Sequence, residues 1–577
     1  MKLTKILSCI LTVVLILSFA LISVNAQTPS FTGGMINVDG LMYRTSSDGT
    51  ATLSKGNFML TGEFTIPAEV NGYLVTSIGD YSFQHCDKIT SIVIPATVNH
   101  IGYSAFYGCE KLESVTIPDS IEEIEYAAFY GCKSLKTAKI ADMAAWCAAK
   151  LDGPYANPAH ITGKLDFGTP TKDLVIPSYI GSIGAYSFYG CKDINSVQIS
   201  EGITKIGECA FYGCENLTEI TVPKSVVKIE DGAFSSCGKL SVVGVSTDNT
   251  NYKNLVGALV ELETKTLIKG FNNTQLPNDG SIERIGAYAF SGCDNLVSIN
   301  LPDCISYIGV SAFKDCRKLT SVTLPKNLTN INSGLFSGCE QLNGITLPES
   351  ILRIGGNAFR NCKSLTAIAI PKNTTEIGDF AFADCIGLTE LKFPASLKKF
   401  GEGVTAGANS ITSLSVENGS SYYSFDNCII KSGTVLAGCK TSRIPVNDLI
   451  SKIESYAFSG QTGLTQIAIS KSIKDIGVNA FDGCTSLSNV YYGGEEDDWN
   501  TVKISEGNVA LSDATKLYNN TDMPEIPTSD NGGLGGVIFG ENGNLWPIII
   551  IIIVAVVLIA GAVVTIFIVK RKKAKKA

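Results

Sequence analysis

Residues 308–325 read Ile-Gly-Val-Ser-Ala-Phe-Lys-Asp-Cys-Arg-Lys-Leu-Thr-Ser-Val-Thr-Leu-Pro. The last part of this stretch alternates apolar and polar residues, which predicts a short β-strand with one buried face. The proline that follows cannot donate a backbone hydrogen bond, so the strand ends there. The first part, Ile-Gly-x-x-Ala-Phe-x-x-Cys, returns the chain to the start of the next strand.

This pattern occurs thirteen times, with the phenylalanines of neighbouring copies 23 residues apart within each run. Every copy has Ile five residues before its Phe and Leu or Ile six residues after it. One such turn cannot bury its own apolar face, so stacked turns must share a core. We therefore expect a leucine-rich-repeat-like β solenoid of 23-residue turns with short parallel strands. The thirteen phenylalanines are Phe83, Phe106, Phe129, Phe188, Phe211, Phe234, Phe290, Phe313, Phe336, Phe359, Phe382, Phe458 and Phe481.

Three intervals break this spacing, and we expect irregular turns near residues 140–180, 245–280 and 404–450. The second and third intervals resemble each other, which indicates variant turns that carry a hairpin. The first interval contains Trp146 and is the least regular. It is interpreted either as an extended repeat or as a protrusion that binds a partner.

The pattern resembles the BspA-like leucine-rich repeat family of bacterial surface proteins. Asp142-Met143-Ala144-Ala145-Trp146-Cys147 and Val490-Tyr491-Tyr492-Gly493-Gly494 also look like accessory segments of bacterial members. The resemblance implies surface exposure and adhesion to host or matrix proteins. It implies no catalytic residues, because the family pattern has none.

The N-terminal segment is typical of a secretory signal peptide. Lys2 and Lys5 precede an apolar run, and Val24-Asn25-Ala26 fits the small-residue rule for cleavage. We expect residues 1–26 to be removed. Residues 27–77, which lack the repeat, should form an N-terminal β cap on a solenoid that spans residues 78–494.

The C-terminal segment predicts a membrane anchor. Residues 548–569 carry no charge and are long enough to span a bilayer as a helix, and six basic residues follow them. We therefore expect a single transmembrane helix over residues 546–569, a basic cytoplasmic tail over 570–577 and an extracellular repeat region. Residues 495–520 should cap the solenoid, and residues 521–545 should be a flexible linker.

A cysteine follows the Phe by three residues in twelve copies, and Gln461 is the exception. The spacing of 23 fits no zinc motif and marks one repeat position, typical of a small buried apolar residue. Buried free thiols are the favoured interpretation. Disulfides between stacked turns and metal binding remain alternatives.

Composition and motifs argue against several functions. The net charge is −8 although both ends of the chain are basic, so the segment between them is strongly acidic and unsuited to binding nucleic acid. The only histidines, His85, His100 and His160, have no matched nucleophile. We expect no enzymatic activity, no cofactor and no metal site.

Two surfaces are candidate binding sites. The first, here called the strand strip, consists of residues ten positions after each Phe, which point away from the core and are mostly small and neutral. The second consists of tyrosines directly after Phe, with Trp146 as a further candidate, because aromatic residues are common at binding hot spots. The strand strip includes Thr116, Lys139, Gln198, Thr221, Asn300, Thr323, Thr346 and Lys392, and the tyrosines are Tyr107, Tyr130, Tyr189 and Tyr212.

These features predict a membrane-anchored adhesion or recognition protein. Its partner would be a protein ligand on a host cell, in the matrix or on a neighbouring cell. The alternative is a structural or self-associating surface protein without a dedicated ligand.

Overall fold

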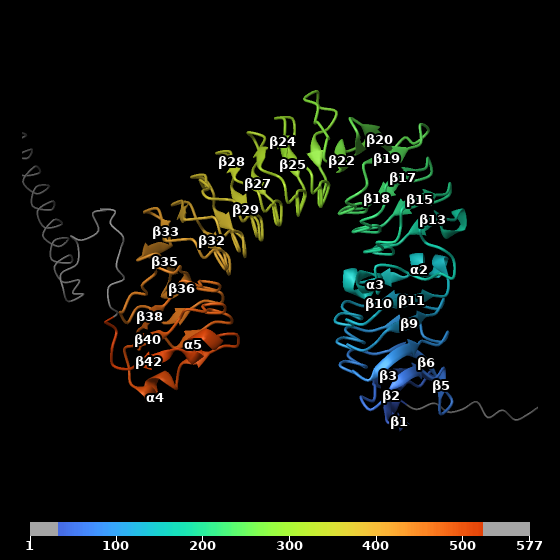
Figure 1. Ribbon diagram of the computed structural model, residues 1–577, viewed down its shortest axis with the longest axis horizontal. Helices are drawn as coiled ribbons and strands as arrows, with labels where there is room; N and C mark the ends of the chain where they lie inside the picture. Colours follow the sequence, from blue (N-terminus) through green and yellow to red (C-terminus); the bar gives the residue numbers. More distant parts are fainter. Residues whose placement is uncertain (1–32, 523–577) are drawn as a thin grey trace, which may run out of the picture. The chain divides into compact units, whose positions relative to one another are not determined.

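The computed structural model describes residues 33–522. Most turns contribute two short strands to a solenoid (Figure 1). The expected signal peptide (1–26), transmembrane helix (546–569) and tail (570–577) lie outside the described residues, as does nearly all of the expected linker (521–545). Among residues 33–522, no helix has the length and apolar character needed to cross a bilayer. The described residues belong to one compact unit.

The first row of strands lies about nine to eleven residues after the repeated Phe and carries the strand strip; in the turn of Phe359 this segment forms no strand. Neighbouring strands are parallel and in register one repeat apart, with Val197 opposite Ile220 and Val322 opposite Ile345. The sequence prediction of parallel strands in stacked 23-residue turns is therefore confirmed. The row consists of β4 (Gly62–Thr65), β7 (Ile89–Val93), β9 (Ser114–Ile117), β11 (Thr137–Ile140), β13 (Asp173–Ile176), β15 (Ser196–Ile199), β17 (Glu219–Val222), β19 (Val242–Val245), β24 (Ser298–Asn300), β26 (Ser321–Thr323), β28 (Gly344–Ile345), β31 (Glu390–Phe393), β33 (Ser413–Val416), β38 (Gln466–Ile469), β40 (Asn489–Tyr492) and β42 (Thr515–Leu517).

Most strands of the second row lie directly before a repeated Phe and end on the repeated Ile. Most of its strands have only two residues, because the tight Ile-Gly-x-x-Ala-Phe segment begins directly after them. The row consists of β6 (Tyr73–Ile78), β8 (His100–Ile101), β10 (Glu123–Ile124), β12 (Lys150–Leu151), β14 (Ser182–Ile183), β16 (Lys205–Ile206), β18 (Lys228–Ile229), β22 (Thr266–Lys269), β23 (Arg284–Ile285), β25 (Tyr307–Ile308), β27 (Asn330–Ile331), β29 (Arg353–Ile354), β30 (Glu376–Ile377), β32 (Lys399–Phe400), β36 (Thr434–Ala437), β37 (Lys452–Ile453), β39 (Asp475–Ile476) and β41 (Lys503–Ile504).

The repeated phenylalanines form a stacked column in the core between the rows. From Phe290 to Phe382 the ring centroids of neighbouring turns lie 5.0 to 5.7 Å apart, and all these rings are fully buried. Burial of an aromatic ring and its stacking on the next ring both stabilise the fold. The column therefore joins each turn to its neighbours.

The repeated cysteines form a second column. All seventeen described cysteines are free thiols. In the regular turns each thiol donates a hydrogen bond to the carbonyl of the Phe in the preceding turn, as Cys316 does to Phe290 O at 3.2 Å and Cys339 to Phe313 O at 3.1 Å. Burial raises the pKa of Cys385 to about 12, so this thiol stays protonated at neutral pH.

Two positions of every Phe-containing turn have a left-handed backbone, which the sequence did not reveal. The residue two positions after Phe is glycine in most turns, which suits a positive φ. The residue two positions before Phe also has a positive φ but is mostly not glycine, so the tight packing of the turns imposes this strained conformation. These residues are Tyr81, Ser104, Ala127, Tyr186, Cys209, Gly232, Tyr288, Ser311, Gly334, Asn357, Phe380, Tyr456 and Asn479.

Two antiparallel hairpins interrupt the stack, as the similarity between their sequences predicts. In the first, β20 (Tyr252–Leu255) and β21 (Ala258–Glu261) pair before β22; in the second, β34 (Tyr423–Phe425) and β35 (Cys428–Lys431) pair before β36. The middle strand of the first hairpin, β21, places side chains in two separate hydrophobic cores. Leu259 packs in the core before the first hairpin, while Ala258 and Val260 pack in the core after it.

The third irregular interval begins later than the Phe spacing indicates. Residues 394–416 form a further regular turn, because Leu414 pairs with Leu391 one repeat earlier. The Phe and Cys positions of this turn hold Thr405 and Ala408, both buried. The phenylalanine spacing could not detect a turn that lacks its phenylalanine.

The remaining elements lie at the two ends and in the first irregular interval. Strands β1 (Gly34–Val38), β2 (Leu41–Thr45) and β3 (Thr50–Lys55) are antiparallel, and β3 pairs in parallel with β6. The other elements are β5 (Glu69–Val70), the α-helices α2 (Met143–Ala148), α3 (Ala159–Thr162), α4 (Glu496–Trp499) and α5 (Val509–Asp513), and the 3-10 helices η1 (Pro154–Ala156) and η2 (Ser178–Ile180).

Candidate recognition surfaces

The strand strip is exposed but interrupted. Seven of its eight candidate residues are exposed, and Thr116 is half-buried. Neighbouring strands bring some of them together, with Thr116 opposite Lys139, Gln198 opposite Thr221 and Asn300 opposite Thr323. The row is divided among several sheets, so the candidates do not form one continuous ladder.

Two shallow hollows lie on the strand strip. One, of about 700 Å³, is lined by Gln198 and Thr221. The other, of about 410 Å³, is lined by Lys392, whose ammonium forms an ion pair of 3.0 Å with Glu417. Their linings are mainly small polar and aliphatic residues, which offer contact area without an aromatic anchor.

The tyrosines directly after Phe form a row of ring contacts along one edge of the solenoid. Tyr107 stacks on Tyr130 at 5.5 Å, and Tyr189 stacks on Tyr212 at 4.9 Å with an interplanar angle of 2°. The structure therefore brings the four predicted tyrosines together as two stacked pairs.

The first irregular interval joins these two pairs. Tyr155 from η1 contacts Tyr130 at 4.8 Å, and His160 from α3 contacts Tyr155 at 4.7 Å and Tyr189 at 5.8 Å. Desolvation between these rings, together with the charge of Lys192, lowers the pKa of His160, so its imidazole is neutral at pH 7. Tyr155 and His160 are not among the candidate site residues, although both lie in the irregular interval for which a binding protrusion is the alternative interpretation.

A second row of tyrosines meets the first at Tyr155. Tyr81 contacts Tyr103 at 5.4 Å, Tyr103 stacks on Tyr126 at 6.1 Å, and Tyr126 contacts Tyr155 at 5.8 Å. Tyr81, Tyr103, Tyr126 and Tyr130 are 38–50% exposed. We call the two rows together the aromatic edge, which comprises Tyr81, His85, Tyr103, Tyr107, Tyr126, Tyr130, Tyr155, His160, Tyr186, Tyr189, Tyr212 and Tyr288.

Trp146 is not a surface residue, which corrects its place among the candidates. The first residues of α2 are capped by Asp142, and this helix turns the indole inward, where it is fully buried. The indole N–H donates a hydrogen bond of 2.7 Å to Ser187 O. Trp146 therefore fills the core where the regular repeat is missing and cannot contact a partner.

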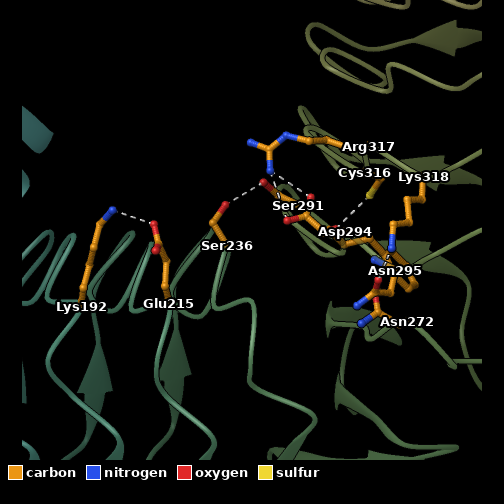
Figure 2. A network of polar contacts seen from close by, with 11 residues as sticks. Lys192, Glu215, Ser236, Asn272, Ser291, Asp294, Asn295, Cys316, Arg317 and Lys318 are labelled. Carbon is orange, nitrogen blue, oxygen red and sulfur yellow. Dashed lines mark hydrogen bonds and ion pairs between the residues drawn. The ribbon is translucent and has the colours of Figure 1, made fainter.

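Charged side chains link neighbouring turns on both sides of the first hairpin. Lys192 pairs with Glu215 at 2.8 Å and Arg317 pairs with Asp294 at 3.2 Å, each across one repeat (Figure 2). Such exposed pairs contribute little to stability. Within residues 33–522 no cluster of His, Cys, Asp and Glu could hold a metal ion.

Comparisons with known proteins agree with this architecture. The BspA type leucine rich repeat region matches the chain in six copies, over residues 65–145, 167–273, 266–362, 329–441 and 420–501, which is well over half of its length. No similar sequence is found among curated proteins.

Several solved structures are similar to this chain. A leucine rich cell surface protein from Faecalibacterium prausnitzii A2-165 is 24% identical over 82% of this chain and 99% of its own, with a TM-score of 0.39. A leucine-rich repeat protein from Bacteroides ovatus ATCC 8483 is 22% identical over 84% of this chain and 99% of its own, with a TM-score of 0.31. One from Eubacterium ventriosum ATCC 27560 is 20% identical over 66% of this chain and 95% of its own, with a TM-score of 0.34.

Proposed function

This chain belongs to the BspA-type leucine-rich repeat family, and we propose that it is a non-catalytic recognition protein of the cell surface. Its partner is a protein on a host cell, in the matrix or on a neighbouring cell. The aromatic edge supplies the main contacts, and the strand strip adds weaker ones.

The observation that carries this proposal is the set of half-exposed tyrosines on one edge. Tyrosine offers a large, rigid contact surface with a polar hydroxyl, and it is common among residues that dominate binding energy. Tyr126 and Tyr130 are 41% and 44% exposed and are both held by Tyr155. Because these rings are fixed before binding, little conformational entropy is lost when a partner covers them.

Membrane anchoring and orientation are a separate part of the proposal and rest on the sequence of the two ends. A protease added to intact cells should degrade the chain N-terminal to Trp546 and spare the basic tail. The mature chain should begin at Gln27. A repeat region that stays protected in intact cells would contradict this orientation.

The binding proposal is tested with a soluble chain of residues 27–522, applied to cultured epithelial cells and to immobilised matrix proteins. For each cell type or matrix protein that this chain binds, the double variant Tyr130→Ser/Tyr189→Ser should have an affinity at least tenfold lower. The matched control is Tyr179→Ser, because Tyr179 is 73% exposed but lies on η2, outside the aromatic edge.

Sedimentation of the same chain distinguishes the alternative function. A chain that binds no cell or matrix protein but forms oligomers that depend on its concentration would be a self-associating surface protein. Loss of binding by the Tyr179 control as large as that of the double variant would contradict the role of the aromatic edge.

A further inference from the structure

The N-terminal end of the solenoid leaves one strand edge open. There the second row of strands ends on the hairpin of β1 and β2, and β1 is the last strand of its sheet (Figure 1). Among the described residues, β2 is the only strand that pairs with β1. The other edge of β1 therefore has no strand beside it.

The geometry of the hairpin shows which backbone groups of β1 face this open edge. The turn between β1 and β2 has two residues, both with a positive φ, so the residues that flank it, Val38 and Leu41, exchange backbone hydrogen bonds. Hydrogen-bonded and non-hydrogen-bonded pairs alternate along an antiparallel ladder. The N–H and C=O groups of Met35 and Asn37 therefore point away from β2, toward the open edge.

This edge lacks the features that normally protect a terminal strand. Terminal strands are usually short, charged or covered, because an exposed edge pairs readily with another chain. β1 has five residues, Gly-Met-Ile-Asn-Val, and none of them is charged. The side chain of Met35 is 53% exposed. By these criteria β1 is suited to pairing.

The other terminal strands provide an internal comparison. At the C-terminal end the second row ends on β41, which has only two residues, one of them Lys503. The first row ends there on β42, whose central residue is Lys516. At the N-terminal end the first row ends on β4, which exposes Glu63. Of these four terminal strands, β1 is the longest and the only one without a charge.

Exposed apolar side chains lie beside the turn between β1 and β2. The loop after β3 carries Phe58 and Met59, which are 63% and 64% exposed. Asn57 in the same loop reaches the turn, because its Nδ2 would lie 2.6 Å from a Cβ added to Gly40. The end turns of a solenoid normally have a polar outer face that keeps the protein soluble. Exposed apolar residues next to an open strand edge are typical of an interface instead.

We propose that β1 pairs in antiparallel orientation with β1 of a second copy of this chain and so joins two solenoids end to end. An uncharged edge is complementary to itself across a two-fold axis, since each N–H meets a C=O and no like charges oppose each other. The register that uses all the outward groups places Met35 opposite the second copy's Asn37. Ile36 then lies on the axis, opposite its own equivalent.

This pairing goes beyond the proposed recognition of another protein. It uses β1 and not the aromatic edge, so a chain that does not pair can still bind its partner, and a paired chain keeps its aromatic edge. The expected membrane anchor follows the C-terminal end of the solenoid. Pairing therefore joins the ends that lie farthest from the anchor along the chain.

The test measures the mass of residues 27–522 by sedimentation equilibrium between about 1 and 100 µM, where we expect a monomer–dimer equilibrium. Met35→Pro removes an N–H from the open edge but no hydrogen bond to β2, and should raise the dissociation constant of the dimer at least tenfold. Met35→Thr loses the apolar side chain but keeps the N–H, and should stay within threefold of the parent. The matched control is Val509→Ser, which changes a 67% exposed residue of the C-terminal cap and should have no effect.

A cysteine cross-link tests the register. Ile36→Cys should form a covalent dimer under mild oxidation, because a residue on the axis lies within disulfide range of its equivalent. Asp39→Cys, in the turn, should not, and the parent protein controls for the native cysteines.

A chain that stays monomeric at about 100 µM would show that another partner or the chain's own N-terminal residues cover this edge, and would overturn the proposal. A dimer that Met35→Pro leaves unchanged, in a protein that circular dichroism shows to be folded, would also overturn it. If Met35→Pro does not fold, the cross-link decides, and the absence of a covalent dimer of Ile36→Cys would overturn the proposal.

Discussion

The turns of Phe83 to Phe234 and those of Phe290 to Phe382 have the same interior and different edges. In both regions the Phe rings are buried and stacked, and the thiols donate to the preceding Phe carbonyl. Directly after Phe, however, four of the six turns in the first region have tyrosine, whereas no turn in the second region does. The residues there are Tyr107, Tyr130, Tyr189 and Tyr212 in the first region, and Ser291, Lys314, Ser337, Arg360 and Ala383 in the second.

The difference in the residue after Phe shows which features the fold requires and which belong only to the surface. Serine, lysine, arginine and alanine all occupy the position after Phe while the stacked Phe column continues, so the solenoid core does not need tyrosine there. In the second region this position carries Arg360, for example, whose guanidinium pairs with Asp384 at 3.3 Å. The tyrosines directly after Phe are therefore a property of the first region that the packing of the core does not require.

The largest expected effect concerns the shared interior. Phe106→Ala and Phe313→Ala should each lower the free energy of unfolding by about 3–5 kcal/mol, as truncation of core aromatic residues does. Urea denaturation of residues 27–522 measures both. Because turns contact mainly their neighbours, the loss should spread to adjacent turns in each region. A loss of stability in only one of the two variants would show that the interiors of the two regions are not equivalent.

The next effect concerns the irregular interval of the first region. Trp146→Phe keeps an aromatic ring in the core but leaves the Ser187 carbonyl with Asn157 Nδ2, at 3.1 Å, as its side-chain donor, so loss of the indole hydrogen bond should lower stability by about 1 kcal/mol. Thermal unfolding measures this loss. Binding to cells or matrix should not change at a temperature where the variant is folded. A binding defect at that temperature would show that Trp146 contributes to recognition and not only to the core.

The sequence predicts the repeated part of this structure well, because one pattern repeated thirteen times defines the strands, the core and the stacking. It fails where the pattern is absent. The turn around Thr405 lacks both Phe and Cys, and Trp146 is buried by a helix that belongs to no repeat. Tyr155 and His160, which join the two stacked tyrosine pairs, also lie outside the repeat, so their position depends on tertiary packing.

A small effect is expected from the strand strip, which both regions share. Thr221→Ala in the first region and Thr323→Ala in the second should each weaken binding by a few tenths of a kcal/mol, as near-neutral contacts do. Calorimetric or surface-based affinity measurements on residues 27–522 test this. Complete loss of binding from one of these changes in a folded chain would show that the strand strip, and not the aromatic edge, dominates recognition.

The smallest effect is a pH dependence confined to the aromatic edge. Since the folded state lowers the pKa of His160, the unfolded chain binds the proton more tightly, and stability should decrease as pH falls below about 6.5. The fall in unfolding temperature between pH 7.5 and pH 5.5 should be smaller in His160→Gln. An identical fall in both proteins would show that His160 does not titrate in this way.

The most direct test of the account compares two fourfold variants of residues 27–522. In the first, Tyr107, Tyr130, Tyr189 and Tyr212 are changed to serine, which several other turns have at this position; in the second, Gln198, Thr221, Thr323 and Thr346 of the strand strip are changed to alanine. Affinity for the bound cell or matrix protein is measured for both, with circular dichroism as the control for folding. The account predicts that the tyrosine variant stays folded and loses at least tenfold in affinity, while the strand-strip variant loses less. A folded tyrosine variant with unchanged affinity would contradict it.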